Sequence, residues 1–301
     1  MATRFELVLH GPDRVALQSA GEMAIREIER IGKRFSFYDP ASELSRLNRQ
    51  AFKREMVVAG DFFELLLLCD GLFKSTNGFF DPTIGPLMKL WLAGAEKKKA
   101  PTPAAIQKAI AITGWNGVCL DARNYSVHFL NEGLQIDLGG IAKGWAIDEA
   151  VQLLVEAGVS KALVHGGTSS VRAIGTLDDQ KHWTVGIQDP YHRQGDAQWF
   201  STVELNDRAL SVSAVNGKSF VDQNLEYGHI INPKSGLAKT GPYVAWVTGS
   251  TAVTCDAWST ALLAGFQKSA KTNPEMGLDP RLYAAYVAHK RNFSWDIETL
   301  L

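Results

Sequence analysis

The stretch DLGGIAKGWAIDEAVQLLVEAGVSKALVHGGTSSVRAIG, residues 137–175, contains the pattern that decides the fold. It opens with a glycine-rich turn that runs into a helix, and Gly158 is the kind of residue that ends one. Two strands follow, KALVHGG and SVRAIG, with only a few turn residues between them. A helix followed by closely spaced strands favours an antiparallel sheet with helices packed beside it.

Further helices and short strands are predicted on both sides of this stretch. Before it, the sequence predicts a strand over 3–9, helices over 15–35, 60–76 and from Pro103, and a hairpin over 116–136 with a short strand at its end. After it come strands at 183–190, 200–206, 209–214 and 243–249, a loop that begins at His229, and a last helix over 251–266. The predicted fold class is α+β, with a mostly antiparallel sheet or partial barrel flanked by helices.

Composition excludes several classes of protein. Hydrophobic residues make up 46% and charged residues 21% of the 301 positions, and the formal net charge is -1, which predicts a soluble globular protein without a nucleic-acid-binding surface. No signal peptide or membrane span is visible, so we expect a cytoplasmic protein. Cys69, Cys119 and Cys255 have apolar neighbours, which predicts buried free thiols in a reducing compartment.

The segment Asp137–Gly144 is the first candidate site. Gly139 and Gly140 precede a helix, and a glycine-rich turn at a helix N-terminus exposes backbone N–H groups that favour phosphate. Lys143 adds a positive charge in the first helical turn. The spacing alone fits equally well a tight turn with a surface lysine.

Asp256 and Thr260 form the second candidate site, in the sequence CDAWSTAL. They are four residues apart and share one face of a mostly apolar helix. An acid on a buried helix must be paired, capped or bound to a cation. A carboxylate and a hydroxyl suit Mg²⁺, whereas the simpler alternative is an aspartate near the helix start that interacts with the helix dipole.

Two further positions stand out less strongly. His229, in GHIINPKSG, has a side chain suited to a general base near neutral pH, although a lone histidine is more often a hydrogen-bonded core residue. Tyr38, in FYDPASELSRLN, could stack on a ring system, although the bare pattern is only a turn and a helix capped by Ser42.

Taken in order, these motifs resemble the ApbE family of FAD:protein FMN transferases along nearly the whole chain. The resemblance is carried by FSFYDPASELSRLN, GFFDPTIGPL, IDLGGIAKGWAID, ALVHGGTSSVRAIG, HIINPKSG and CDAWSTAL. It implies one ApbE-like domain over residues 1–301. It also implies FAD contacts at Met1, Tyr38, Phe80, Asp81, Asp137, Lys143 and Ile231, and a magnesium site at Gly140, Asp256 and Thr260, with His229 as the catalytic base.

The implied reaction transfers FMN from FAD to a threonine or serine hydroxyl of an acceptor flavoprotein and releases AMP. Two alternatives stay open: a pyrophosphatase that cuts FAD into FMN and AMP, and a protein that binds FAD without chemistry. The second is motivated by departures from the family pattern, in which Asn232 and Thr168 stand where aspartate is common, Ser213-Ala214 replaces Ser-Gly, and Ala2 replaces glycine.

Overall fold

The computed structural model describes residues 3–177, 182–192, 198–216, 219–266, 276, 279–291 and 294–301. Its largest element is a seven-stranded antiparallel sheet in the order β1-β5-β6-β9-β13-β14-β15. These strands are β1 (Phe5–His10), β5 (Lys161–Gly166), β6 (Ser170–Ile174), β9 (Ala209–Ala214), β13 (Tyr243–Gly249), β14 (Leu282–Arg291) and β15 (Ser294–Thr299). β1 and β15 are opposite edges of this sheet, so it is open and not a closed barrel.

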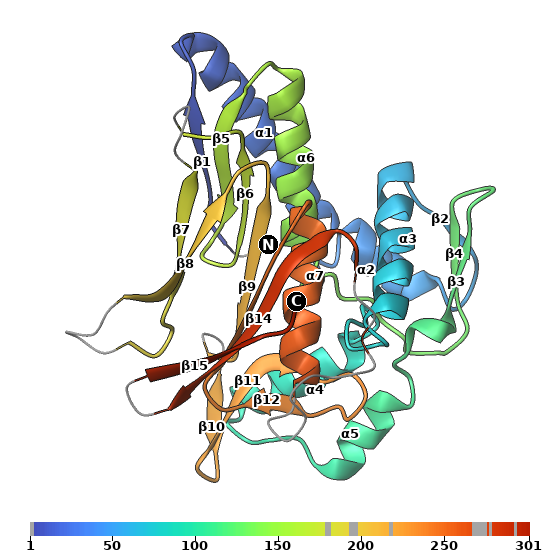
Figure 1. Ribbon diagram of the computed structural model, residues 1–301. Coiled ribbons are helices and arrows are strands. Elements are labelled where there is room, and N and C mark those ends of the chain that lie inside the picture. The colour runs from blue at the N-terminus through green and yellow to red at the C-terminus, as the bar shows by residue number, and fades with distance from the viewer. Residues whose placement is uncertain are drawn as a thin grey trace.

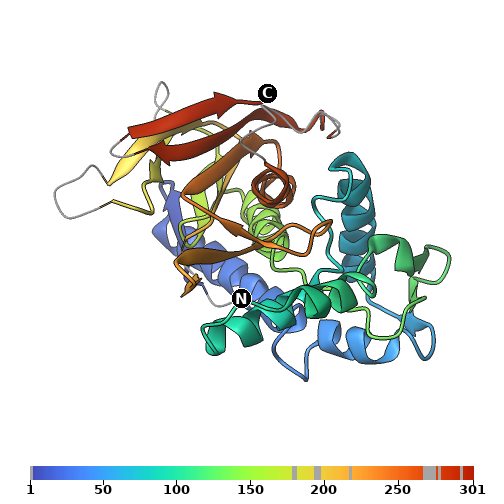
Figure 2. The ribbon, with the colours of Figure 1, turned by 90° about the horizontal axis from the view of Figure 1, so that it is seen from below.

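Three long helices cover one face of the sheet. They are α1 (Arg14–Arg34), α6 (Ala142–Glu156) and α7 (Ala252–Gly265). Figure 1 shows α1 and α6 side by side next to β1, β5 and β6, while α7 lies along β9 and β13. In Figure 2 α7 is seen end-on, with strands of the sheet on one side and α3, which spans Gly60–Ser75, on the other.

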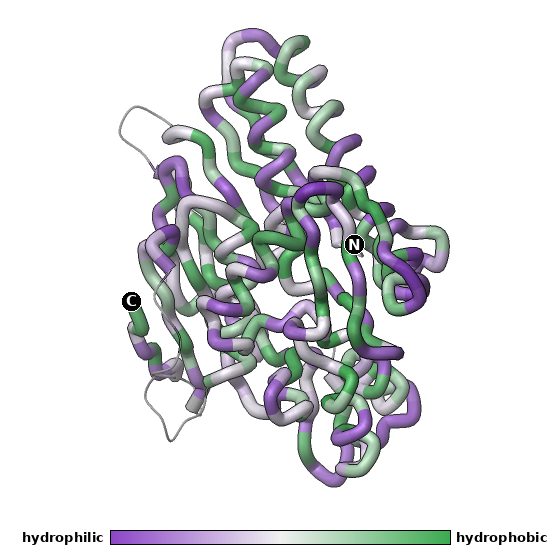
Figure 3. The backbone as a smooth tube through the Cα atoms, turned by 90° about the vertical axis from the view of Figure 1, so that its right-hand side faces the viewer, coloured by the Kyte–Doolittle hydropathy of each residue, from purple (hydrophilic) through white to green (hydrophobic). Residues whose placement is uncertain are grey.

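Amphipathic patterning explains why these helices pack as they do. The apolar residues Leu17, Ala20, Ala24, Ile28 and Ile31 are spaced to share one face of a helix; α1 buries the last four and leaves Leu17 partly buried. Asp13 caps the first turn of α1 by accepting hydrogen bonds from two backbone N–H groups. Along the helices at the top of Figure 3 the colour alternates between hydrophilic and hydrophobic, as expected for helices that bury one face. By contrast, α7 is buried almost all round.

The remaining elements form a second layer and three small sheets. The helices are α2 (Glu43–Gln50), α3 (Gly60–Ser75), α4 (Gly85–Glu96), α5 (Pro103–Ile110) and the 3₁₀ turn η1 (Trp115–Gly117). The strands are β2 (Met56–Val57), β3 (Val118–Asp121) and β4 (Ser126–Phe129) in one sheet, β7 (Trp183–Gln188) and β8 (Trp199–Leu205) in another, and β10 (Phe220–Asp222), β11 (Leu225–Ile231) and β12 (Ala238–Thr240) in the third. In the described part of the chain, no helix has both the length and the apolar character needed to cross a bilayer.

The structure confirms the predicted fold class and corrects four local predictions. His229 lies inside β11, and the loop starts only at Asn232. The expected strand after the hairpin is reduced to one isolated bridge between Ile84 and Gln135. Cys119 is exposed because it lies on a surface strand, whereas Cys69 and Cys255 are buried as expected. The paired strands β14 and β15 follow the last helix, where the sequence analysis predicted no element.

Candidate active site

The site is built on a close contact between α6 and α7. Gly144, in the first turn of α6, has no side chain, and a Cβ added there would lie 2.3 Å from the carbonyl oxygen of Ala252. One turn further along α6, the carboxylate of Asp148 accepts hydrogen bonds from the backbone N–H groups of Ala252 at 3.0 Å and Val253 at 2.8 Å. It also pairs with Arg172. Asp148 thus caps α7 from a neighbouring helix and fixes the two helices to each other.

This contact brings Lys143 of α6 to Asp256 of α7. The Lys143 ammonium lies 3.0 Å from Oδ1 and 3.2 Å from Oδ2 of Asp256, and the Gly144 N–H donates to Oδ2 at 3.2 Å. The two side chains are only 21% and 3% exposed. Asp256 is therefore the paired buried acid that the sequence required. The alternative of a surface lysine is wrong, because the Lys143 side chain is mostly buried in this ion pair.

Gly140, Phe80 and Thr260 meet beside this ion pair. A Cβ on Gly140 would lie 3.4 Å from Thr260 Oγ1 and 3.6 Å from the Phe80 ring, so all three residues are in close contact. The Thr260 hydroxyl donates to the backbone carbonyl of Asp256 at 3.0 Å. Its proton is thus directed back along α7, which leaves oxygen lone pairs available to a ligand.

Asp137 lies at the start of the glycine-rich turn, and Tyr38 lies near it. The Asp137 carboxylate accepts a hydrogen bond from the Gly139 N–H at 2.7 Å, which shapes the turn, and burial raises the pKa of this carboxyl. Tyr38 is 68% exposed, and partial burial together with the negative charge of Asp137 raises the pKa of its phenol. The structure thus places an accessible aromatic ring close to the glycine-rich turn.

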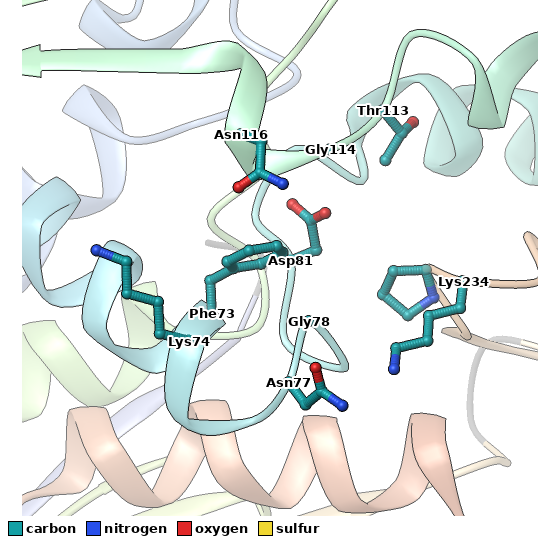
Figure 4. Close-up of a pocket in the computed structure, with 10 residues that line it drawn as sticks. Phe73, Lys74, Asn77, Gly78, Asp81, Thr113, Gly114, Asn116 and Lys234 are labelled. Carbon is teal, nitrogen blue, oxygen red and sulfur yellow. The ribbon is translucent and has the colours of Figure 1, made fainter. Parts of the chain in front are cut away.

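A cavity of about 520 Å³ lies next to Asp81, the residue that follows Phe80 in the sequence (Figure 4). Its lining residues are Phe73, Lys74, Asn77, Gly78, Asp81, Thr113, Gly114, Asn116, Pro233 and Lys234. The Asp81 carboxylate points toward Gly114 and Asn116 and accepts hydrogen bonds from the Thr83 N–H at 2.8 Å and the Thr83 hydroxyl at 2.6 Å. Burial raises the pKa of Asp81, and the Lys234 ammonium lies 4.3 Å from the Phe79 ring centre.

β11 contributes His229 and Ile231. The pairing of β11 with β12 is irregular between Tyr227 and Ile231, and such a bulge redirects side chains. His229 is exposed, so the alternative of a core histidine is wrong, whereas the side chain of Ile231 is buried in a small hydrophobic cluster. β11 packs against α7, the helix that carries Asp256. Met1 lies outside the described residues.

Asn232, one of the departures from the family pattern, has a clear structural role. Its side-chain oxygen accepts hydrogen bonds from the N–H groups of Lys234 at 2.9 Å and Ser235 at 3.1 Å. Its amide nitrogen donates to the carbonyl of Ala264 at 3.1 Å, near the end of α7. An aspartate could not make this last bond, so the amide suits the present loop.

The sequence analysis missed a group of serines around Asp256. Ser170 and Ser211 each place a hydroxyl 3.3 Å from Asp256 Oδ1, and Ser213 and Ser259 extend the group toward Thr260. The serines at 211 and 213 alternate along β9, so a strand pattern with small polar residues on one face was the available signal.

The oxygen donors fit a small hard cation better than a transition metal. Among the described residues, no group of three or more His, Cys, Asp or Glu side chains could hold a metal ion. Asp256, Thr260 and the carbonyl of Gly140 instead offer a carboxylate, a hydroxyl and a backbone oxygen. Mg²⁺ accepts such oxygen donors and commonly completes its shell with water and substrate phosphates.

Comparisons with known proteins agree with this architecture. A protein from Klebsiella pneumoniae strain 342 named FAD:protein FMN transferase is 28% identical over 286 residues, covering 92% of this chain and 80% of its own. A protein of the same name from Treponema pallidum is 30% identical over 243 residues, which cover 76% of this chain and 66% of its own length. A crystal structure of an ApbE protein from Thermotoga maritima superposes with a TM-score of 0.79 at 26% identity, covering 95% of this chain and 94% of that one.

The model of the ApbE family matches residues 1–276, which include the glycine-rich turn, the helices α6 and α7, and β11. The chain therefore belongs to the ApbE family.

Proposed function

We propose that this protein is a magnesium-dependent FAD:protein FMN transferase. The observation that carries the proposal is the buried ion pair between Lys143 and Asp256 at the glycine-rich start of α6. It places a cationic side chain, a carboxylate and a helix N-terminus at one point, which suits a pyrophosphate bound with a divalent cation. The curated relatives that carry this enzyme name support the choice of FAD as the substrate.

Asp256, Thr260 and the Gly140 carbonyl would hold Mg²⁺, which when bound neutralises negative charge on the pyrophosphate oxygens. Lys143 and the first N–H groups of α6 would bind the phosphates, and the ring of Tyr38 would lie against a flat part of FAD. The cavity beside Asp81 is large enough to hold part of a dinucleotide.

His229 is proposed as the general base. Its exposure on β11 leaves it open to a hydroxyl that approaches from a partner protein. The hydroxyl loses its proton to His229 while its oxygen forms a bond to the FMN phosphorus. The bond from that phosphorus to the bridging oxygen breaks, and AMP leaves with the bridging oxygen. The partner is an acceptor flavoprotein with an accessible threonine or serine.

Mass spectrometry of an acceptor flavoprotein domain, after incubation with the purified chain, FAD and Mg²⁺, tests this function. The expected result is one FMN added to a threonine or serine, lost in Asp256→Ala and His229→Ala. His182→Ala is the matched control, because His182 is exposed and lies just before β7. It should leave transfer unchanged.

Other products would contradict the transferase. Free FMN and AMP beside an unmodified acceptor would indicate a pyrophosphatase, in which water takes the place of the protein hydroxyl. FAD that stays bound and intact in excess Mg²⁺ would indicate an FAD-binding protein without chemistry.

A further inference from the structure

Hydroxyl groups surround the two side chains that the proposed function assigns to a cation. The two side chains are those of Asp256 and Thr260, and the surrounding hydroxyls belong to Ser170 of β6, Ser211 and Ser213 of β9, and Ser259 of α7. Ser170, Ser211 and Ser259 are completely buried. Burying a hydroxyl without a hydrogen bond is costly, so each of these groups needs a partner.

Three of the serines connect Asp256 with Thr260. The Ser211 hydroxyl lies 3.3 Å from Asp256 Oδ1, and the Ser259 hydroxyl lies 3.4 Å from that of Ser211. The Ser213 hydroxyl is 2.9 Å from Ser259 and 3.5 Å from Thr260 Oγ1. We call Ser211, Ser259 and Ser213 the hydroxyl chain. It starts in the buried core beside the carboxylate and ends at the partly exposed Thr260.

The two oxygens of Asp256 have different surroundings. Ser170 and Ser211 both direct hydroxyls at Oδ1, whereas Oδ2 accepts from the backbone N–H of Gly144. Lys143 contacts both oxygens. A carboxylate with separate donors on each oxygen cannot rotate without losing bonds, so its plane is fixed even when Lys143 moves.

We propose that the hydroxyl chain positions Asp256 and Thr260 as a pair for a divalent cation. This inference rests on the proposed function and extends it to residues that do not touch the cation themselves. Metal ligands commonly depend on such outer hydrogen-bond partners, whose removal weakens metal binding about ten- to a hundred-fold.

Two of the hydroxyls also have backbone partners. The Ser211 hydroxyl lies 3.1 Å from the carbonyl oxygen of Ser169, and the Ser259 hydroxyl lies 3.1 Å from that of Asp256. Replacing both members of a buried hydrogen-bonded pair with apolar groups of similar shape is often nearly neutral, but the buried Asp256 would still need donors. The hydroxyls on Oδ1 therefore stabilise the buried acid and fix its orientation at the same time.

The test measures the binding of Mn²⁺ to the folded full chain by electron paramagnetic resonance, once with FAD and once without it. Ser211→Ala and Ser259→Ala should each raise the Kd for Mn²⁺ about ten-fold or more. They should raise the KM for Mg²⁺ in the same proportion and leave the KM for FAD near its original value. Ser126→Ala is the control, because Ser126 is 3% exposed on β4, outside the hydroxyl chain.

Ser213→Ala provides a second route if the buried variants fail to fold, because Ser213 is only partly buried. Folded variants of the hydroxyl chain that bind Mn²⁺ within two-fold of the wild type would overturn the inference, and so would a wild-type chain that binds no Mn²⁺. Loss of Mn²⁺ affinity in the variants without any FMN transfer by the wild type would support the inference and refute the proposed function alone.

Discussion

Replacing Gly144 with alanine should separate α6 from α7 and displace the two charged groups of the site. The added methyl carbon would lie 2.3 Å from the Ala252 oxygen, 2.6 Å from the carbonyl carbon of Ala252 and 2.6 Å from the Val253 Cα. Carbon atoms pack best at about 3.5–4.0 Å. All three neighbours are backbone atoms, so no rotamer change relieves the overlap, and the helices must move apart by roughly 1 Å.

The expected loss of stability follows from two opposing effects. Overpacking of this kind costs about 1–3 kcal/mol. Alanine in a helix recovers up to about 1 kcal/mol relative to glycine. With the full gain from alanine, the free energy of unfolding should therefore fall by up to about 2 kcal/mol. The rate of FMN transfer should fall further, by up to about 100-fold, because Lys143 and Asp256 lie on the two helices that separate.

Gly71→Ala is the matched control for this change. Gly71 lies inside α3, and a Cβ added there would meet no atom within 4 Å. The free energy of unfolding of this variant should rise by about 0.5–1 kcal/mol, and its rate of FMN transfer should stay the same. Urea unfolding followed by tryptophan fluorescence measures the first quantity, and mass spectrometry of the acceptor measures the second. A Gly144→Ala protein as stable and as active as Gly71→Ala would refute the reasoning about the helix contact.

Two further changes test other contacts. Asp148→Ala should lower the free energy of unfolding, measured in urea, by about 3–5 kcal/mol, because it leaves Arg172 and the start of α7 without their partner. A loss below about 1 kcal/mol, which is typical of a surface ion pair, would contradict this prediction. Hydrogen bonds from Arg34 lower the pKa of Asp61 from 3.8 to about 2, so the stability it contributes is present above pH 4 and is lost as the pH falls toward 2. Asp61→Asn should therefore flatten that part of the stability curve in acid titrations monitored by fluorescence, and an unchanged slope would rule out this contribution.

Local patterns in the sequence were sufficient for most of the fold. The stripe Ala20, Ala24, Ile28 and Ile31 repeats at helical spacing, and α1 buries these four residues. The alternation of SVRAIG and ALSVSA gave strands that pair in the large sheet. Strand order was beyond reach, because β6 pairs with β9 across a long separation in the chain, and no local pattern encodes that choice.

Predicting the site required distances that a sequence does not contain. The helical spacing of Asp256 and Thr260 showed that they share a face, but their partner Lys143 is 113 positions away from Asp256. Gly144 was visible only as one glycine in a turn, although its lack of a side chain is what permits the helix contact. The alternation of Ser211 and Ser213 along β9 showed that they share a face, but only the fold brings that face to the carboxylate of Asp256.

Asn232 shows that a departure from a family pattern has to be judged by its contacts. An aspartate at this position would keep the bonds that its oxygen accepts from Lys234 and Ser235. It would lose the bond donated to Ala264 and would place a negative charge beside the last carbonyls of α7, where the helix dipole is also negative. The amide is therefore suited to this loop, and Asn232 is not one of the residues proposed to hold the cation, which are Asp256, Thr260 and Gly140. The removal of a negative charge at Asn232 is consequently no argument against cation binding by this chain.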